Sequence, residues 1–298
     1  SITRWDLISG IIPPLTLDSW QQSFSLYKKI PEFKLQNSLM TLDEFKVIFW
    51  WEFVHRLLGR LIGIIFLVPL ILFSIKLGFS KMANFYLIFI LICLQGFLGW
   101  YMVSSGLVNK IDVSHFRLAL HLVLAFIILS LVYWNILKYN YIKLPRKKIN
   151  NILPIFFLIL LFVQIIVGAF VSGMDAGKIY NTWPNMGTGF FPNDNSFANL
   201  FNFSALSNPS LVQFLHRNLA YIILFFYLVI FLKVYINKLS GFFKILYVIG
   251  AILTLQIFLG ILTLLSGAQI FVSSMHQISS IFLISSSIYF LYLNTKIN

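Results

Sequence analysis

Long apolar runs separated by short polar stretches form the main pattern along the chain. Seven runs are long enough for a helix to cross the hydrocarbon core of a bilayer, which takes roughly 20 apolar residues. Because lipid offers the backbone no hydrogen-bond partner, continuous runs of this length predict helices. We therefore expect an all-α polytopic membrane protein. The runs cover residues 47–75, 83–106, 117–138, 152–172, 211–234, 243–266 and 271–293.

Composition and charge agree with a membrane class and predict an orientation. The 298 residues are 59% hydrophobic and 10% charged, which excludes an ordinary soluble globular protein. The net charge of +13 does not indicate a nucleic-acid partner, because basic residues gather in alternate loops, as the positive-inside rule describes. We expect these loops and the C-terminus to be cytoplasmic. The residues are Lys76, Lys81, Lys138, Lys143, Arg146, Lys147, Lys148, Lys233, Lys238, Lys244 and Lys296.

The two halves of the chain resemble each other. The stretch from Glu52 to Arg56 matches the stretch from Gln213 to Arg217. Three helices without histidine share another pattern, in which a glutamine precedes a glycine by four positions. Small residues let membrane helices approach closely, and a glutamine can bond across to a neighbouring helix. The three pairs are Gln95 and Gly99, Gln164 and Gly168, and Gln256 and Gly260.

These matches predict two pseudo-symmetric helical bundles that repeat in parallel. Each bundle alternates packing helices with histidine helices, but the first bundle has one helix fewer than the second. The repeat therefore predicts a further helix before Ser1, and eight helices in all. We expect an extracytoplasmic segment, an N-terminal half bundle, a cytoplasmic linker and a C-terminal four-helix bundle, at 1–46, 47–138, 139–151 and 152–298.

Four histidines occupy matching places near the outer ends of four apolar runs. Imidazole inside a membrane is costly unless it is paired or coordinated. Each histidine has a small residue four positions later, on the same helix face, which leaves room for a flat ring. The pattern favours two bis-histidine haem sites over hydrogen-bonded packing residues or a zinc or copper site, which remain alternatives. The histidines are His55, His121, His216 and His276.

One titratable residue distinguishes the two halves. Glu52 lies three residues before His55, on the same helix face, and its counterpart in the second half is the neutral Gln213. A carboxylate beside a metal site can exchange a proton or hold a water molecule, so we expect chemistry in the first half. Glu52 could also form an ion pair with Arg56. Both Arg56 and Arg217 are candidates for binding haem propionates, or for reaching toward lipid headgroups.

Several strings resemble one known family, the haem A synthases of the alphaproteobacterial and mitochondrial type. The resemblance covers nearly the whole chain, without the loop cysteine pair of the other type and without the first transmembrane helix. It rests on residues 44–60, Phe116 to Leu122, Gly173 to Gly177, Tyr180 to Pro184 and Gln213 to Arg217.

The resemblance implies an enzyme that oxidises the C8 methyl group of haem O to the formyl group of haem A, for cytochrome c oxidase. The course would be two hydroxylations followed by loss of water. His216 and His276 would bind the iron of a haem b cofactor. The substrate haem iron would lie between His55 and His121, with Glu52 beside it.

The resemblance also implies a bacterial cell membrane, with lipid around the helices. Haem O is the expected substrate, haem O synthase and an electron donor are candidate partners, and a homo-oligomer is left open. Two other functions remain alternatives. Symmetric sites in the two halves would favour a non-enzymatic dihaem cytochrome b. A haem transporter would predict weak ligation of the haem or ligation by a single residue.

Overall fold

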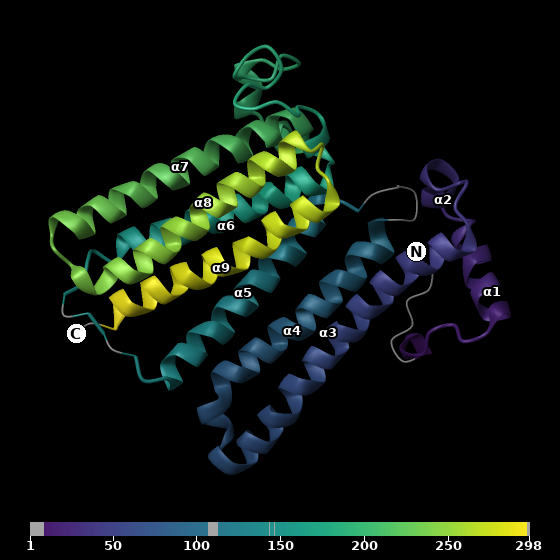
Figure 1. Cartoon of the computed structure of the whole chain (residues 1–298). Coiled ribbons are helices and arrows are strands. Elements are labelled where there is room, and N and C mark those ends of the chain that lie inside the picture. Colours follow the sequence, from purple (N-terminus) through teal and green to yellow (C-terminus); the bar gives the residue numbers. More distant parts are fainter. Residues whose placement is uncertain (1–8, 107–112, 143, 146, 297–298) are drawn as a thin grey trace. The chain divides into compact units, whose positions relative to one another are not determined.

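The computed structural model describes residues 9–106, 113–142, 144–145 and 147–296 (Figure 1). The contacts between residues divide the chain into two compact units, Ser1–Arg117 and Leu118–Asn298. Among the described residues, regular structure is helical except for an isolated bridge between Met186 and Gly189. The predicted all-α class is confirmed, whereas the predicted half-bundle boundaries stay a prediction.

Seven helices in the described part of the chain are long and apolar enough to cross a membrane. Their ends lie within a few residues of the predicted runs, because an apolar run in lipid has to form its hydrogen bonds internally. The helices are α3 (Leu42–Leu77), α4 (Phe79–Gly106), α5 (His115–Tyr139), α6 (Ile152–Gly173), α7 (Pro209–Ile236), α8 (Phe243–Leu265) and α9 (Ile270–Thr295).

The polar segment before α3 folds onto the start of that helix. It contains the short helices η1 (Ser9–Ile11), α1 (Leu17–Tyr27) and α2 (Pro31–Gln36). Tyr27 and Phe45 are fully buried between α1 and α3, with their ring centroids 5.1 Å apart. Burial is the main cause that raises the pKa of Tyr27 to about 12. The phenol therefore stays protonated and donates to Glu32 at 2.9 Å.

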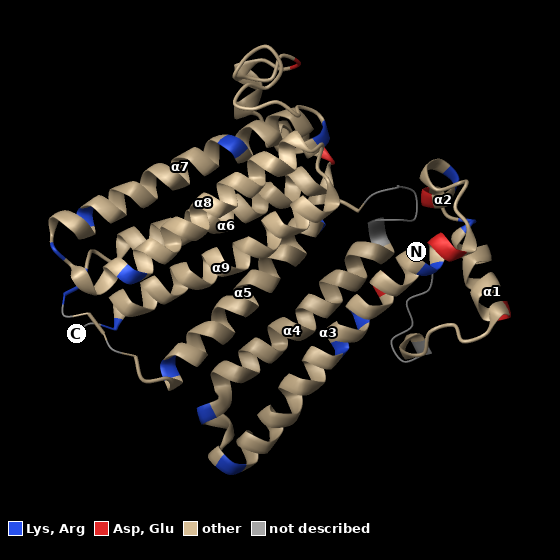
Figure 2. Cartoon of the chain, in the orientation of Figure 1, with Lys and Arg blue, Asp and Glu red and all other residues tan. Residues whose placement is uncertain are grey.

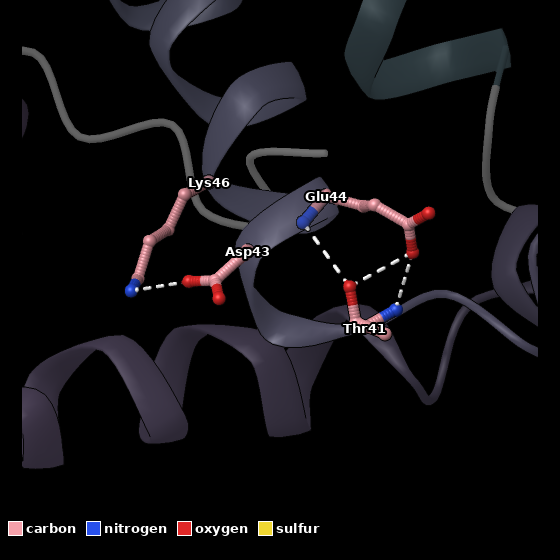
Figure 3. A network of polar contacts seen from close by, with 4 residues as sticks. All are labelled: Thr41, Asp43, Glu44 and Lys46. Atoms are coloured by element: carbon pink, nitrogen blue, oxygen red, sulfur yellow. Dashed lines mark hydrogen bonds and ion pairs between the residues drawn. The ribbon is translucent and has the colours of Figure 1, made fainter.

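The helix α3 begins several residues before the apolar run because a capping box starts it in polar sequence (Figure 3). The backbone N–H of Thr41 donates to the Glu44 carboxylate at 2.8 Å, and the backbone N–H of Glu44 donates to Thr41 Oγ1 at 3.3 Å. Two otherwise unpaired helix donors are satisfied in this way. An ion pair of 2.8 Å between Lys46 and Asp43 lies beside the box.

The helices α3 and α4 pack on each other but present most of their surface outward. In their most apolar stretches, only 11% and 6% of residues are buried in the protein, compared with 50% for α9. Exposed apolar surface of this extent indicates contact with lipid or with another membrane helix.

In the second unit, α6, α7, α8 and α9 form a four-helix bundle (Figure 1). The helix α6 packs on α7 and α9, and α8 packs on the same two helices. Large apolar side chains from all four helices fill its core, including Phe157, Ile230, Ile249 and Phe290. The helix α5 contributes Phe126 and Leu137 to this core.

The two ends of the second unit differ in charge. Lysines lie where α5 and α7 end and where α6 and α8 begin (Figure 2). At the same end, Asn294 of α9 is fully buried. It accepts from the backbone N–H of Ile149 at 2.9 Å and donates to the carbonyl of Ile149 at 3.1 Å, which fastens the basic linker to α9. The opposite end carries the long loop 174–208, with η2 (Ala176–Lys178), η3 (Phe197–Phe201) and η4 (Phe203–Ser207).

Candidate functional site

Two of the predicted histidine ligands lie close together inside the second unit. His216 of α7 and His276 of α9 are both partly buried, with ring centroids 6.4 Å apart and ring planes at 80°. A metal–imidazole bond is about 2 Å. With the ring centre about 1 Å further back, two imidazoles on opposite sides of one metal ion have centroids roughly 6 Å apart. The spacing therefore fits a bis-histidine metal centre.

Each of these histidines is held by a glutamine from the helix that precedes its own. Gln164 of α6 donates through Nε2 to the backbone carbonyl of His216 at 3.1 Å. Gln256 of α8 donates through Nε2 to the backbone carbonyl of His276 at 3.0 Å. The expectation that these glutamines bond across to a neighbouring helix is confirmed for both.

A glycine one turn beyond each glutamine makes room for the imidazole ring. A Cβ atom on Gly168 would lie 3.0 Å from Cε1 of His216, and one on Gly260 would lie 3.1 Å from Cε1 of His276. Both distances are shorter than ordinary van der Waals contact between carbon atoms, which is about 3.5–4.0 Å. An alanine at either position would therefore require the imidazole or the helix to shift by a few tenths of an ångström.

The hydrogen bonds of the rings indicate which nitrogens are available. Nδ1 of His276 lies 3.0 Å from the backbone carbonyl oxygen of Gln256. A carbonyl can only accept, so Nδ1 carries the proton and Nε2 keeps a lone pair, as in metal-binding histidines. In His216, Nδ1 is buried without a hydrogen-bond partner among the described residues, while Nε2 lies 3.4 Å from the Gln164 amide. His276 therefore has an Nε2 lone pair suited to a metal ion, whereas binding through Nε2 of His216 would replace its contact with the Gln164 amide.

Arg217, predicted as a propionate partner, holds the loop 174–208. Its terminal nitrogens donate to the backbone carbonyls of Tyr180 at 2.8 Å, Thr182 at 2.9 Å and Asn185 at 3.3 Å. Gln213, one turn earlier on α7, also donates to the carbonyl of Tyr180 at 3.0 Å. Nε of Arg217 is buried without a hydrogen-bond partner among the described residues. Its binding of a propionate stays a prediction.

The same loop is tied to the start of α7 by Asp194. The carboxylate accepts from the Tyr180 hydroxyl at 2.8 Å and from the Ser210 hydroxyl at 2.7 Å. Burial acts to raise the pKa of Asp194, but these hydrogen bonds outweigh it and lower the pKa. The loop is therefore fastened by an ionised carboxylate at neutral pH.

The predicted residues of the first unit lie in the N-terminal half of α3. Arg56 is buried, and its guanidinium lies 3.9 Å from the Glu52 carboxylate, so the predicted ion pair is present. Arg60 donates to the backbone carbonyl of Gly10 at 3.1 Å. Arg60 on α3 thus bonds the polar segment that precedes α3, just as Arg217 on α7 bonds the loop that precedes α7. The side chain of Glu52 is 25% exposed, and His55, one turn later on α3, is exposed.

The proposed ligands of the substrate haem belong to different units. His55 lies on α3 in the first unit, and His121 lies half-buried on α5 in the second. Their pairing stays a prediction. Among the described residues, no group of three or more His, Cys, Asp or Glu side chains is arranged to hold a metal ion, so the alternative of a multi-ligand zinc or copper site gains no support.

Comparison with known proteins decides the family. Residues 1–288 match the model of the COX15-CtaA family, cytochrome oxidase assembly protein. The chain belongs to this family. Its relatives include proteins named haem A synthase. The one from Pelagibacter ubique is 50% identical over 99% of this chain and 88% of its own length. Those of Rickettsia bellii and Rickettsia prowazekii are 43% and 39% identical, over 96% and 99% of this chain and 87% and 90% of their own lengths.

Family membership confirms the resemblance predicted from the sequence. The contacts of Gln164 and Gln256 with the histidines were not predicted, although their repeated motif was recognised. The glutamine lies 52 residues before the histidine in one case and 20 in the other. No fixed spacing therefore signals the pairing, and only the packing of the helices shows it.

Proposed function

We propose that this chain is a haem A synthase, which oxidises the C8 methyl group of haem O to a formyl group and so provides haem A for cytochrome c oxidase. The observation that carries the proposal is the close pair of His216 and His276 in a chain 50% identical to a haem A synthase over 99% of its length. The names of the relatives favour an enzyme over a non-enzymatic cytochrome.

His216 and His276 are proposed to hold a resident haem b. The 6.4 Å separation of their rings supports this assignment. When bound, haem b would supply one-electron chemistry, with a potential set by the residues that hold it and by their surroundings. The chain itself would contribute the two nitrogens, the glycine gaps beside them and an apolar bundle core. Nε of Arg217, the residue after His216 on α7, has no hydrogen-bond partner among the described residues and is a candidate donor to a propionate.

The first half is proposed to bind haem O. The sequence repeat pairs His55 with His121 as it pairs His216 with His276, and this correspondence supports them as ligands of the substrate iron. Glu52, one turn before His55, is proposed to move protons or position water during the oxidation. Its carboxylate lies 3.9 Å from the Arg56 guanidinium, one turn further along the same helix.

The enzyme is proposed to lie in a bacterial cell membrane with its basic loops and C-terminus in the cytoplasm. Lysines at one end of the second unit support this orientation (Figure 2). Haem O synthase and a membrane electron donor are its proposed partners, and a homo-oligomer is a further proposal.

Expression in a bacterium that makes haem O but lacks its own haem A synthase tests the activity. The host provides the electrons and the oxygen source, and extracted haems are identified by mass. We expect a product heavier than haem O by one oxygen atom less two hydrogen atoms. Unchanged haem O beside a normal haem b spectrum would contradict the enzyme and favour the cytochrome. In the His216→Ala and His276→Ala variants, the low-spin haem b spectrum should disappear.

A further inference from the structure

The two proposed haem b ligands share one supporting arrangement, although their sequences around it differ. In each case a glutamine amide from the neighbouring helix donates to the backbone carbonyl of the histidine, at 3.1 Å and 3.0 Å. In each case the glycine one turn later faces the ring. The arrangement occurs twice in the same bundle, on α6 against α7 and on α8 against α9, which argues against an accident of packing.

A bond to the backbone carbonyl constrains the whole helix around the histidine. The carbonyl oxygen has two lone pairs, so it can accept a second hydrogen bond besides the one within its helix. Because the donor belongs to a different helix, the bond limits both the rotation and the sliding of the histidine helix. The imidazole is joined to that backbone through two torsions with few favoured values and stands against glycine on one side, so the position of its nitrogens is limited as well.

We propose that Gln164 and Gln256 are positioning residues for His216 and His276, which hold the two imidazoles at the separation that a haem iron requires. This proposal rests on the proposed haem b site. Neither glutamine is proposed to touch the iron or the substrate. Each acts through the histidine that it holds.

The two supports are unequal, which leads to a specific expectation. Gln256 contacts His276 twice, through its side-chain amide and through the backbone carbonyl that accepts from Nδ1. The Ser279 hydroxyl also contacts its amide oxygen. The amide oxygen of Gln164 is buried without a hydrogen-bond partner among the described residues, and its Nε2 is what bonds His216. Loss of the side chain should therefore disturb His216 more than His276.

Replacement by methionine tests the proposal, because methionine keeps the length and apolar stem of glutamine and removes the N–H donor. We compare purified haem-loaded Gln164→Met, Gln256→Met and wild-type protein. The readouts are the low-spin haem spectrum and the rate of haem transfer to excess apomyoglobin. Loss of a residue that holds a metal ligand in place typically weakens the affinity for the metal by about 10–100-fold. We expect faster haem release and a high-spin fraction in both variants, with the larger effect at Gln164.

The matched control is Gln277→Met, the same replacement at an exposed position beside His276, which should behave as wild type. If a methionine variant fails to accumulate in the membrane, Ser279→Ala keeps the Gln256 amide N–H, removes the hydroxyl contacts to the Gln256 amide oxygen and the His276 carbonyl, and should give an intermediate rate. Wild-type spectra and release rates in both methionine variants would overturn the proposal, provided that His216→Ala and His276→Ala lose haem b. If those histidine variants keep the low-spin spectrum, the proposed haem site itself is wrong.

Discussion

A Cβ atom added to Gly260 would lie 3.1 Å from Cε1 of His276. Alanine favours an isolated helix over glycine by about 1 kcal/mol, so a Gly260→Ala variant would be more stable if only helix propensity mattered. We expect the opposite for the haem site, because the ring has to move. The protein should keep its helix content and lose haem b affinity by about 10-fold or more, measured by haem content after purification.

The control for this prediction is Gly96→Ala on α4. A Cβ atom there meets no described heavy atom within 4 Å. This variant should retain haem b fully. Equal haem content in the two variants would show that the imidazole adjusts without cost and that the close approach of Gly260 is not required.

Glu52→Gln should separate the two halves of the protein. The change copies Gln213, so we expect the fold and the haem b spectrum to persist. Activity should fall by about 10²–10⁴-fold if the carboxylate moves protons, with a hydroxylated haem accumulating among the extracted pigments. Mass analysis of those pigments is the measurement. Normal haem A formation would leave Glu52 with no role beyond its ion pair with Arg56.

The reverse change, Gln213→Glu, should loosen the loop 174–208. Gln213 is buried and donates to the carbonyl of Tyr180 at 3.0 Å, whereas a carboxylate offers no N–H and would attract Arg217 away from the loop. An unsatisfied buried group costs about 1–3 kcal/mol. Limited proteolysis of the loop should therefore proceed faster in this variant. A cleavage rate equal to that of the wild type would show that the donated N–H is dispensable.

Acid should release the same loop. The pKa of Asp194 is lower in the folded protein than its usual value of about 3.9. Its ionised form therefore stabilises the loop above that pH, and this contribution is lost as the pH falls through the folded pKa. Hydrogen exchange in residues 180–194, corrected for its intrinsic pH dependence, should accelerate below about pH 4. Asp194→Asn should remove this pH dependence, and a variant that kept it would point to another group.

The orientation can be tested by labelling a single cysteine. With Cys93 replaced by serine, a cysteine at Lys147 should react with a membrane-impermeant reagent only after the cells are opened, whereas a cysteine at Asn193 should react in intact cells. The basic linker predicts this result. Labelling of position 147 in intact cells would reverse the topology.

The helices could be predicted from the sequence because lipid leaves an apolar run no other backbone conformation. The start of α3 could not, since a capping box at Thr41 extends the helix into polar residues. The repeat in the sequence identified the four histidines as candidate ligands. The glutamines that hold two of these histidines could not be predicted, because a helical pattern shows on which face a glutamine lies but not which atom of the neighbouring helix it contacts. Arg217 likewise reads as a free cation in the sequence, and the folded loop supplies its carbonyl partners.

The helix α9 follows the other described helices in the chain, and half of the residues in its most apolar stretch are buried in the protein. It carries His276, and both of the helices on which it packs, α6 and α8, are synthesised earlier. During synthesis the first three helices of the bundle therefore enter the membrane with an open side. His276 arrives only when α9 closes that side, so a haem held by both proposed ligands could bind only after α9 has joined the bundle.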